Sequence, residues 1–282
     1  KGGANFNLDD NHKVFGNVGY FERAPFFNTV FLNNRNIAND DAENQKIFSA
    51  ELGYGFRNQN LRVDFNLYRT AWKDKTLARS FVQGNQQIFA NILGVDALHQ
   101  GIELEFEYKA TDRLNITGMM SLGDWKWDNN IDNVDILAED GTTVLGTINV
   151  AIDGVEVGNS AQTTAALGLN YEVFPSTFLR GDFTYYDRYF ADFDPTVRDS
   201  VDLQGPFELP DVGLLDLGLT HKFEFGSFDA TINANVFNVL DTEYISDARE
   251  GNVKDPDYRG LVDSNVWYGF GRTYSVGAKI NF

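Results

Sequence analysis

The chain has 282 residues, and its 41 aspartates and glutamates outnumber its 23 lysines and arginines, giving a formal net charge of −18. An acidic excess this large argues against nucleic acid or an anionic bilayer surface as a partner, because the phosphates of either would be repelled. The absence of cysteine excludes a disulfide framework, a thiolate metal site and a cysteine nucleophile.

Apolar and polar residues alternate along most of the chain, with the period of a β-strand whose two faces differ. In the segment 97–109, Ile102, Leu104 and Phe106 share one face, and three glutamates share the other. The alternation predicts eleven strands, near residues 3–8, 13–22, 46–56, 61–80, 97–109, 113–127, 161–173, 177–191, 212–225, 227–240 and 264–282.

The strand lengths and the connections both indicate a barrel that spans a membrane. Several strands exceed the about 5–6 residues usual in globular sheets and reach the about 9–11 that a tilted membrane strand needs. Short connections, near 9–12, 57–60, 110–112, 174–176 and 226, alternate with long ones, near 23–45, 81–96, 128–160, 192–211 and 241–263. Tight periplasmic turns alternating with long outer loops are typical of outer-membrane barrels.

The two faces of such a barrel meet different solvents. We expect the apolar stripes to face lipid and Glu103, Glu105 and Glu107 to face a water-filled lumen, because an unpaired charge in a dry core is costly. Aromatic residues near strand ends are expected to form interfacial girdles: Trp72, Trp125, Trp127, Tyr185, Tyr189, Trp267 and Tyr268. The predicted fold class is all-β, a transmembrane antiparallel β-barrel.

The C-terminal pattern Ser275-x-Gly277-x-x-Ile280-x-Phe282 resembles the signal by which the outer-membrane assembly machinery recognises its substrates. In proteins with that signal the last strand ends in the periplasm, which agrees with the placement of the short turns there. Eleven is an odd number of strands, whereas bacterial barrels close with an even number. We therefore expect residues 1–282 to be the C-terminal portion of a larger barrel.

Four segments, in order along the chain, resemble motifs of one family. They are Glu22-Arg23-Ala24-Pro25-Phe26 ("R-A-P"), Gln100-Gly101-Ile102-Glu103-Leu104-Glu105 ("x-G-I-E-x-E"), the segment 235–244 ("N-x-x-N-L-x-D-x-x-Y") and the segment 268–277 ("G-x-x-R-x-[YFW]-x-x-G"). Together they resemble the TonB-dependent outer-membrane receptors. The segment Asp124-Trp125-Lys126-Trp127 and the acidic loop after it look most like the receptors of Bacteroidetes-type bacteria.

The resemblance implies a 22-stranded barrel with an N-terminal plug, of which this chain would supply the last eleven strands. It also implies import of a scarce nutrient, such as a chelate, an oligosaccharide or a peptide, across the outer membrane of a Gram-negative bacterium. TonB would supply the energy through an N-terminal segment that is missing here. The sequence leaves open whether a surface lipoprotein covers the barrel.

No catalytic constellation is present, because none of the three histidines has a suitably spaced nucleophile or carboxylate, and we expect no enzymatic activity. If the family resemblance holds, Trp125, Trp127, Tyr258 and Arg259 are candidates for ligand contact, since aromatic faces and a fork-shaped donor suit sugars, peptides or chelates. The alternative for the tryptophans is a role in the girdle or in loop packing.

Asp128, Asn130, Asp132, Asp135 and Glu139 approximate the oxygen-ligand spacing of a calcium loop. Asn133 occupies the place where that loop has glycine, so the alternative is a solvated acidic outer loop. The expectation is no resident cofactor, other than this candidate calcium ion.

Two other functions stay open on the sequence alone. One is a passive porin or a barrel subunit of an outer-membrane assembly that lacks active import. The other is a soluble all-β binding protein, which would place the apolar stripes against a second protein layer and would purify without detergent.

Overall fold

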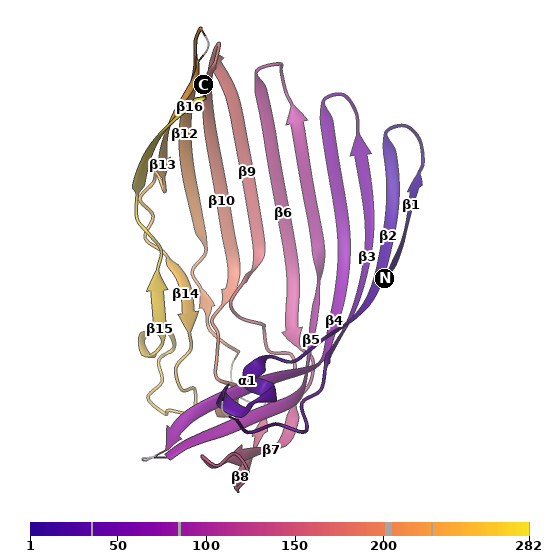
Figure 1. Ribbon diagram of the computed structural model, residues 1–282, viewed down its shortest axis with the longest axis vertical. Coiled ribbons are helices and arrows are strands. Elements are labelled where there is room, and N and C mark those ends of the chain that lie inside the picture. Colours follow the sequence, from indigo (N-terminus) through magenta and orange to yellow (C-terminus); the bar gives the residue numbers. More distant parts are fainter. Residues whose placement is uncertain (35, 84–85, 201–204, 227, 282) are drawn as a thin grey trace.

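The computed structural model describes residues 1–34, 36–83, 86–200, 205–226 and 228–281. Their strands form a large curved antiparallel sheet, in which eleven strands lie side by side (Figure 1), and a second sheet of two strands. In their order in the sheet, the strands are β1 (Gly2–Asn7), β2 (His12–Arg23), β3 (Gln45–Arg57), β4 (Leu61–Gln83), β5 (Gln86–Lys109), β6 (Leu114–Trp127), β9 (Ala161–Phe174), β10 (Thr177–Phe190), β12 (Val212–Phe225), β13 (Phe228–Phe237) and β16 (Thr273–Asn281). The all-β antiparallel class is confirmed, and each of the eleven predicted segments contains a strand of this sheet.

Short turns lie at one end of the sheet and long connections at the other (Figure 1). A side-chain oxygen stabilises three of the short turns by accepting two backbone N–H bonds: Asp9 accepts from Asn11 and His12, Asn58 from Asn60 and Leu61, and Thr111 from Arg113 and Leu114. Such local bonds are the reason that Asp, Asn and Thr favour turns. These three short connections are therefore tight turns that are held by their own hydrogen bonds, at the places where the sequence predicts short turns.

The long connections contain the remaining elements: β7 (Ile131–Leu137), β8 (Val144–Val150), β11 (Glu208–Leu209), β14 (Ile245–Arg249), β15 (Asn265–Tyr268), α1 (Phe27–Val30), η1 (Leu32–Asn34), η2 (Pro195–Val197) and η3 (Gly260–Asp263). Two sequence predictions are corrected here. The expected loop 81–96 is largely strand, because β4 and β5 stay paired far beyond the sheet. The expected single strand 264–282 is two strands in different sheets, β15 with β14 and β16 with β13.

The pairing register assigns each strand residue to a face. One row joins Leu52, Leu67, Ile102 and Leu122 across four strands, and a parallel row joins Tyr54, Phe65, Leu104 and Met120. We call this apolar side the outer face and the opposite side the inner face. On β6 the outer face is apolar from Leu114 to Leu122 and becomes charged at Asp124, a span that matches the about 9–11 residues of a membrane strand.

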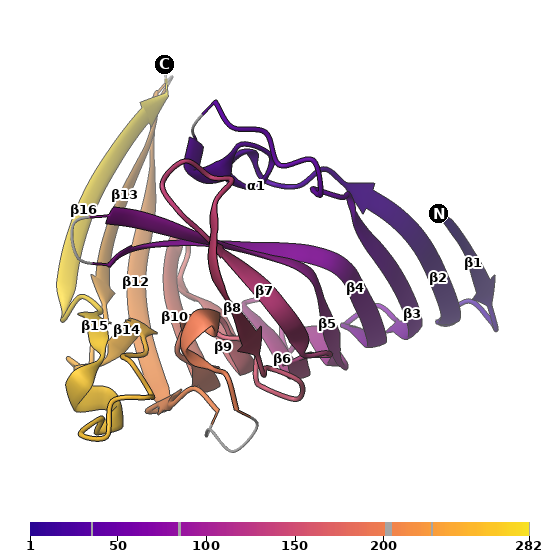
Figure 2. The ribbon, with the colours of Figure 1, turned by 90° about the horizontal axis from the view of Figure 1, so that it is seen from below.

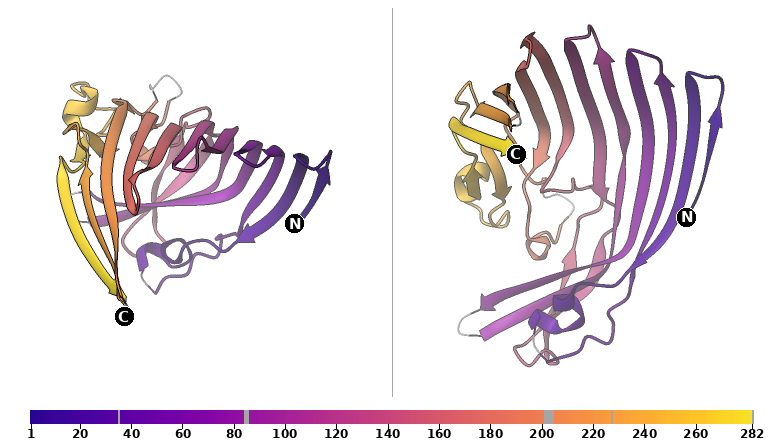
Figure 3. Two further views of the ribbon diagram at one scale, coloured as in Figure 1. Left: turned by 90° about the horizontal axis from the view of Figure 1, so that it is seen from above. Right: turned by 45° about the horizontal axis from the view of Figure 1, so that its top comes forward.

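Beyond the sheet, β4 and β5 form an extended hairpin that bends sharply. Their register shifts on both sides of Lys75, and the bend places Asp74 and Gly94 at positive φ, 58° and 69°. Seen from below, the hairpin crosses the open side of the curved sheet toward the side of β13 and β16 (Figure 2), and the same crossing is visible from the opposite direction (Figure 3).

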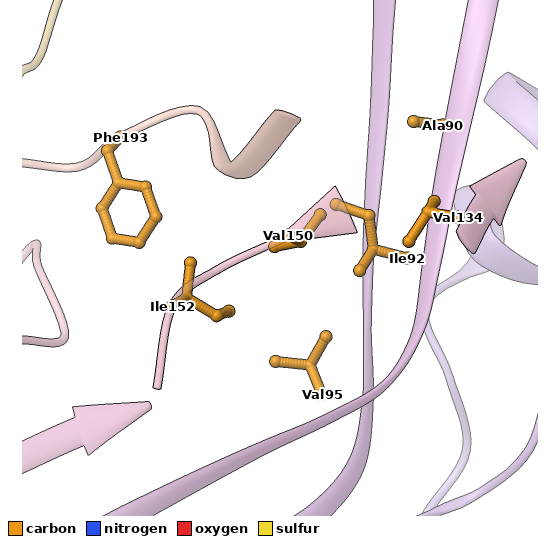
Figure 4. Close-up of a cluster of buried hydrophobic side chains, with 7 residues drawn as sticks. All are labelled: Ala90, Ile92, Val95, Val134, Val150, Ile152 and Phe193. Carbon is orange, nitrogen blue, oxygen red and sulfur yellow. The ribbon is translucent and has the colours of Figure 1, made fainter. Parts of the chain in front are cut away.

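The hairpin and the long loops pack on one another and form a layer with its own hydrophobic core. The main cluster consists of Ala90, Ile92, Val95, Val134, Val150, Ile152 and Phe193 (Figure 4). A second cluster joins Ala191, Leu209 and Ala248. None of the described helices has the length and apolar composition needed to cross a membrane.

The two C-terminal family-like motifs meet where β13 ends. Asn238 is buried at positive φ (49°), its Oδ1 accepts from the Thr242 N–H (2.9 Å), and its Nδ2 donates to the carbonyls of Thr242 (2.9 Å) and Phe270 (3.3 Å). Asp241 Oδ1 accepts from the backbone N–H of Arg272 (2.8 Å). These contacts join the end of β13 to the segment before β16.

Asn238→Ala is expected to destabilise this junction by about 1–3 kcal/mol, because it removes three side-chain bonds and leaves part-buried backbone groups of Thr242 and Phe270 without these partners. Asn235→Ala is the matched control, since the hydrogen bond that the Asn235 side chain donates to Ser275 (3.1 Å) is exposed to solvent. The denaturant midpoint of the full-length protein in detergent is the measurement. Equal midpoints for the two variants would contradict the structural role of Asn238.

Candidate functional site

The inner face of the sheet carries an acidic ladder at the short-turn end. Glu103, Glu105 and Glu107 lie on the inner face of β5, are exposed, and alternate with the outer residues of the same strand, as predicted. Asn66 donates to Glu103 (3.3 Å) and Asn115 to Glu107 (3.2 Å). Within the described residues, no cationic side chain forms an ion pair with any of the three.

The neighbouring inner-face carboxylates are already neutralised. Arg62 pairs with Asp64 (2.7 Å) and Arg180 with Asp182 (2.6 Å). Arg62, Asp64 and Asp182 border a hollow of about 310 Å³, to which Glu105 and Glu107 also contribute. The uncompensated charge of this hollow is therefore negative.

We expect the combined change Glu103→Gln, Glu105→Gln, Glu107→Gln to lower the preference of the pore for cations over anions several-fold, because these carboxylates supply the local negative potential. Reversal potentials of the full-length protein in planar bilayers under a salt gradient are the measurement. Glu243→Gln, in an exposed outer connection, is the control. An unchanged ion preference in the triple variant would contradict the placement of the ladder in the lumen.

An aromatic cluster occupies the inner face where the strands leave the apolar band. The indole N–H of Trp125 donates to the hydroxyl of Tyr68 (2.8 Å), and the rings of Trp72, His99 and Trp125 make edge contacts (centroids 6.3 and 5.6 Å apart). The register places Trp72, Trp125 and Trp127 on the same face as the acidic ladder. The girdle prediction is therefore wrong for these three tryptophans, whereas Tyr185 lies on the outer face with Phe183.

Sequence reasoning missed the residue that fixes Trp125. Gln162 is buried, and its Oε1 accepts a hydrogen bond from the backbone N–H of Trp125 (2.9 Å). Its Nε2 donates to the backbone carbonyl of Trp125 (3.0 Å) and to the carboxylate of Glu156 (3.0 Å). Arg188 donates to the carbonyl of Gly123 (2.8 Å) beside it. A single glutamine at the start of a strand gives no sequence signal for this role.

Trp127 packs against the main core cluster of the loop layer. The ammonium of Lys75 lies over its ring and over that of Trp72, 5.2 and 4.9 Å from the centroids. The two tryptophans proposed for ligand contact are thus part of one half-buried cluster, in which Trp125 is held by hydrogen bonds and Trp127 by packing.

Tyr258 and Arg259 lie elsewhere, in the connection between β14 and β15. Arg259 forms a two-bond ion pair with Asp263 (3.0 and 3.1 Å), so its fork is already occupied. The Tyr258 hydroxyl lies 3.4 Å from that of Ser264, and burial raises the pKa of this tyrosine. Both border a polar hollow of about 400 Å³ with Asp255 and Asp257.

The five candidate calcium ligands are not brought together. Asp132 and Asp135 belong to β7, which pairs with β8, so the segment is a strand and not a loop. Asp128 interacts with Lys73 (3.4 Å), and Asn130 accepts from the backbone N–H of Asp153 (2.9 Å). Across the described ranges, no group of three or more His, Asp or Glu side chains is arranged to hold a metal ion.

A buried ion pair ties the outer connections together. Arg198, after η2, contacts Glu250, after β14, and the two side chains are 0% and 3% exposed. The Arg198 carbonyl accepts from Ala151 (2.7 Å), and its guanidinium lies over Phe193. Burial raises the pKa of Glu250, and Arg198 opposes that shift.

Of the proposed assembly signal, Ser275 and Gly277 lie on the inner face of β16 and Ile280 on the outer face. Phe282 lies outside the described residues.

Comparison with known proteins gives a family match over most of the chain. Residues 1–239 match the family described as "TonB dependent receptor-like, beta-barrel". Among solved structures, the chain resembles the copper transporter OprC (TM-score 0.65, 16% identity, 98% of this chain and 39% of that one). It also resembles the siderophore receptor PiuA from Acinetobacter baumannii (TM-score 0.67, 16% identity, 99% of this chain and 35% of that one). A third similar structure is the ferric yersiniabactin uptake receptor FyuA from Yersinia pestis (TM-score 0.63, 15% identity, 99% of this chain and 36% of that one).

The chain spans little more than a third of these structures. No curated protein sequence matches it.

Proposed function

The chain belongs to the TonB-dependent receptor-like β-barrel family, and from that premise we propose that it is the C-terminal portion of an outer-membrane receptor that imports a scarce nutrient with energy from TonB. The continuous apolar outer face of eleven paired strands carries the proposal, because only a lipid environment accommodates such a face without a second protein layer. The family and its structural neighbours are receptors and transporters, in agreement with the expectation of no enzymatic activity.

The proposed nutrient is a metal ion or a metal chelate. Three structural neighbours are named for copper transport, a siderophore and ferric yersiniabactin uptake, and these names support that class among the chelates, oligosaccharides and peptides that the sequence left open. The proposed partners are outer-membrane lipid, TonB, the assembly machinery that reads the C-terminal strand, and a surface lipoprotein over the outer loops.

Uptake by cells that carry the full-length receptor tests the function. We expect accumulation of labelled iron chelate under iron limitation to depend on the receptor and to stop when the proton-motive force is collapsed or TonB is removed. A passive porin would continue to admit the label after either treatment, and that outcome would overturn active import.

A further inference from the structure

A hollow of about 510 Å³ lies on the outer face of β1, β2, β3 and β4, which are neighbours at the N-terminal side of the sheet (Figure 1). Most of the residues that line it belong to the outer face, on two adjacent rows of the register. Where the same rows continue, β5 and β6 carry Gln100, Ile102 and Leu122. On β1 to β3 the rows instead contain four small residues that line the hollow: Gly2, Ala4, Gly16 and Ala50. The hollow is therefore space that large side chains fill elsewhere on this face.

Aromatic residues border the hollow on two sides. Toward the short turns, the next row of the outer face carries Phe6, Tyr54 and Phe65. Toward the long loops, the next row carries Tyr20 and Phe48. Phe6, Tyr20 and Phe48 are each more than half exposed, so their rings project from the sheet on both sides of a floor of small residues. Because this face meets lipid, an acyl chain is the molecule that such a groove accommodates.

Arg69 places a positive charge at one end of the hollow. It lies two residues beyond Leu67 on β4, in the same register row as Asp124, where the outer face of β6 changes from apolar to charged. Arg69 is exposed, and its guanidinium donates to Gln100 (3.2 Å). The hollow thus extends from the apolar band to the level at which lipid headgroups lie.

Arg69 also differs from the lysines of the outer face at this level. Within the described ranges, no carboxylate forms an ion pair with Arg69, whereas each of these lysines has an acidic partner: Lys46 pairs with Asp74 (2.7 Å), Lys73 with Asp96 (2.7 Å) and Lys126 with Asp124 (3.0 Å). A guanidinium presents several N–H donors in a planar fork, which matches the oxygens of a phosphate. The charge at the end of the groove is therefore available to an anion from outside the chain.

We propose that this hollow binds a phosphate-bearing lipid of the outer leaflet, with one acyl chain in the hollow and the phosphate on Arg69. The acyl chain gains the dispersion contacts that an empty hollow lacks, and the phosphate gains charge-assisted hydrogen bonds. The long-loop end faces outward when the short turns lie in the periplasm, and this places Arg69 in the outer leaflet. The proposal goes beyond nutrient import, because it depends only on the contact of the outer face with lipid.

Native mass spectrometry of the purified full-length receptor, delipidated in detergent, tests the site with lipid A and its dephosphorylated form as probes. We expect the wild type to bind lipid A about tenfold more tightly than the dephosphorylated form, as expected for a charge-assisted bond. Arg69→Gln should abolish this preference and leave binding of the dephosphorylated form unchanged. Lys126→Gln is the matched control and should keep the preference, because Lys126 is already paired with Asp124.

Gly16→Leu tests the hollow itself. A Cβ at Gly16 would lie 3.6 Å from the carbonyl oxygen of Glu51, an ordinary contact, so the new side chain occupies the hollow without displacing the backbone. It should weaken binding of both forms of the lipid several-fold. Gly181→Leu is the matched control, since Gly181 lies on the outer face of β10, and a Cβ there would lie 3.4 Å from the Leu217 side chain. It should bind both forms as the wild type does.

Equal affinity of the wild type for the two forms of lipid A, or unchanged binding in Gly16→Leu, would overturn the proposal. Displacement of lipid A by inorganic phosphate at equal concentration would assign Arg69 to a free anion and would also overturn it. A loss of dimers in Gly16→Leu with unchanged lipid binding would assign the hollow to a second copy of the chain instead. The measurement needs neither TonB nor uptake, so a failure of import in cells would leave its result unaffected.

Discussion

Arg198→Met is expected to open the outer connections at neutral pH, because it leaves Glu250 as a buried charge without its partner. Breaking a buried ion pair by removing one member costs about 3–5 kcal/mol. The lost contact joins the segment after η2 to the segment after β14, so both should lose protection together. Hydrogen exchange of residues 192–200 and 245–251 in the full-length receptor is the measurement.

The sign of the pH dependence gives a second test of the same pair. The pKa of Glu250 is raised by burial, so the folded loops bind its proton more tightly than the unfolded ones do. Protonation of Glu250 therefore favours the folded loops. The free energy of loop opening increases as the pH falls from neutrality through the raised pKa of Glu250 in the folded loops, and it levels off below the pKa of Glu250 in the open loops. In Arg198→Met that pKa is raised further, and mild acid should restore loop protection by neutralising Glu250.

The double variant Arg198→Met, Glu250→Leu is the control, since replacing both members of a buried pair by apolar residues is often neutral or stabilising. It should keep its loop protection at neutral pH and show no recovery in acid. Loss of protection in the double variant as large as in Arg198→Met would refute the explanation by an uncompensated charge.

Leu104→Arg should destabilise the barrel by about 2–4 kcal/mol, the cost of a cationic side chain at the middle of the lipid-facing band. Leu104 is on the outer face of β5, between Phe65 of β4 and Met120 of β6. Denaturant titration of the full-length receptor folded into phospholipid vesicles measures the free energy of unfolding.

Glu105→Arg is the matched control for this prediction, because residue 105 is adjacent in sequence and on the inner face, paired with Asp64 and Met119. It places the same side chain in water and should change the free energy of unfolding by far less. Similar losses for the two variants would mean that the two faces do not meet different solvents.

The sequence predicted the sheet well because lipid and water impose a two-residue period on every strand that lies between them. Ile102 to Tyr108 show this period, and their faces are as expected. Beyond the bilayer this period is lost, because side chains such as Ile92 and Val95 pack in a protein core. Residues 86–96 therefore form a strand although their sequence does not alternate between apolar and polar residues. The alternation of the last segment also did not reveal that β15 ends at Tyr268 and that β16 begins only at Thr273.

The site was less predictable, because its contacts depend on which strands are neighbours and on how the hairpin bends. Trp125 and Trp127 stood out as aromatics, but the partners that determine their roles, Tyr68, Gln162 and Lys75, come from β4 and β9. Asp132 and Asp135 had the spacing of calcium ligands, yet apolar Val134 between them draws the segment into the core as a strand.

The separate core of the loop layer has a thermodynamic consequence. Its seven buried side chains, from Ala90 to Phe193, leave water only when the layer folds, so its melting should carry the positive heat-capacity change of exposed apolar surface. The apolar outer face of the sheet stays in hydrocarbon whether the loop layer is folded or melted, so it contributes no heat-capacity change to this transition. Calorimetry of the full-length receptor in vesicles should therefore resolve a low-temperature transition of the loops from the loss of the barrel itself.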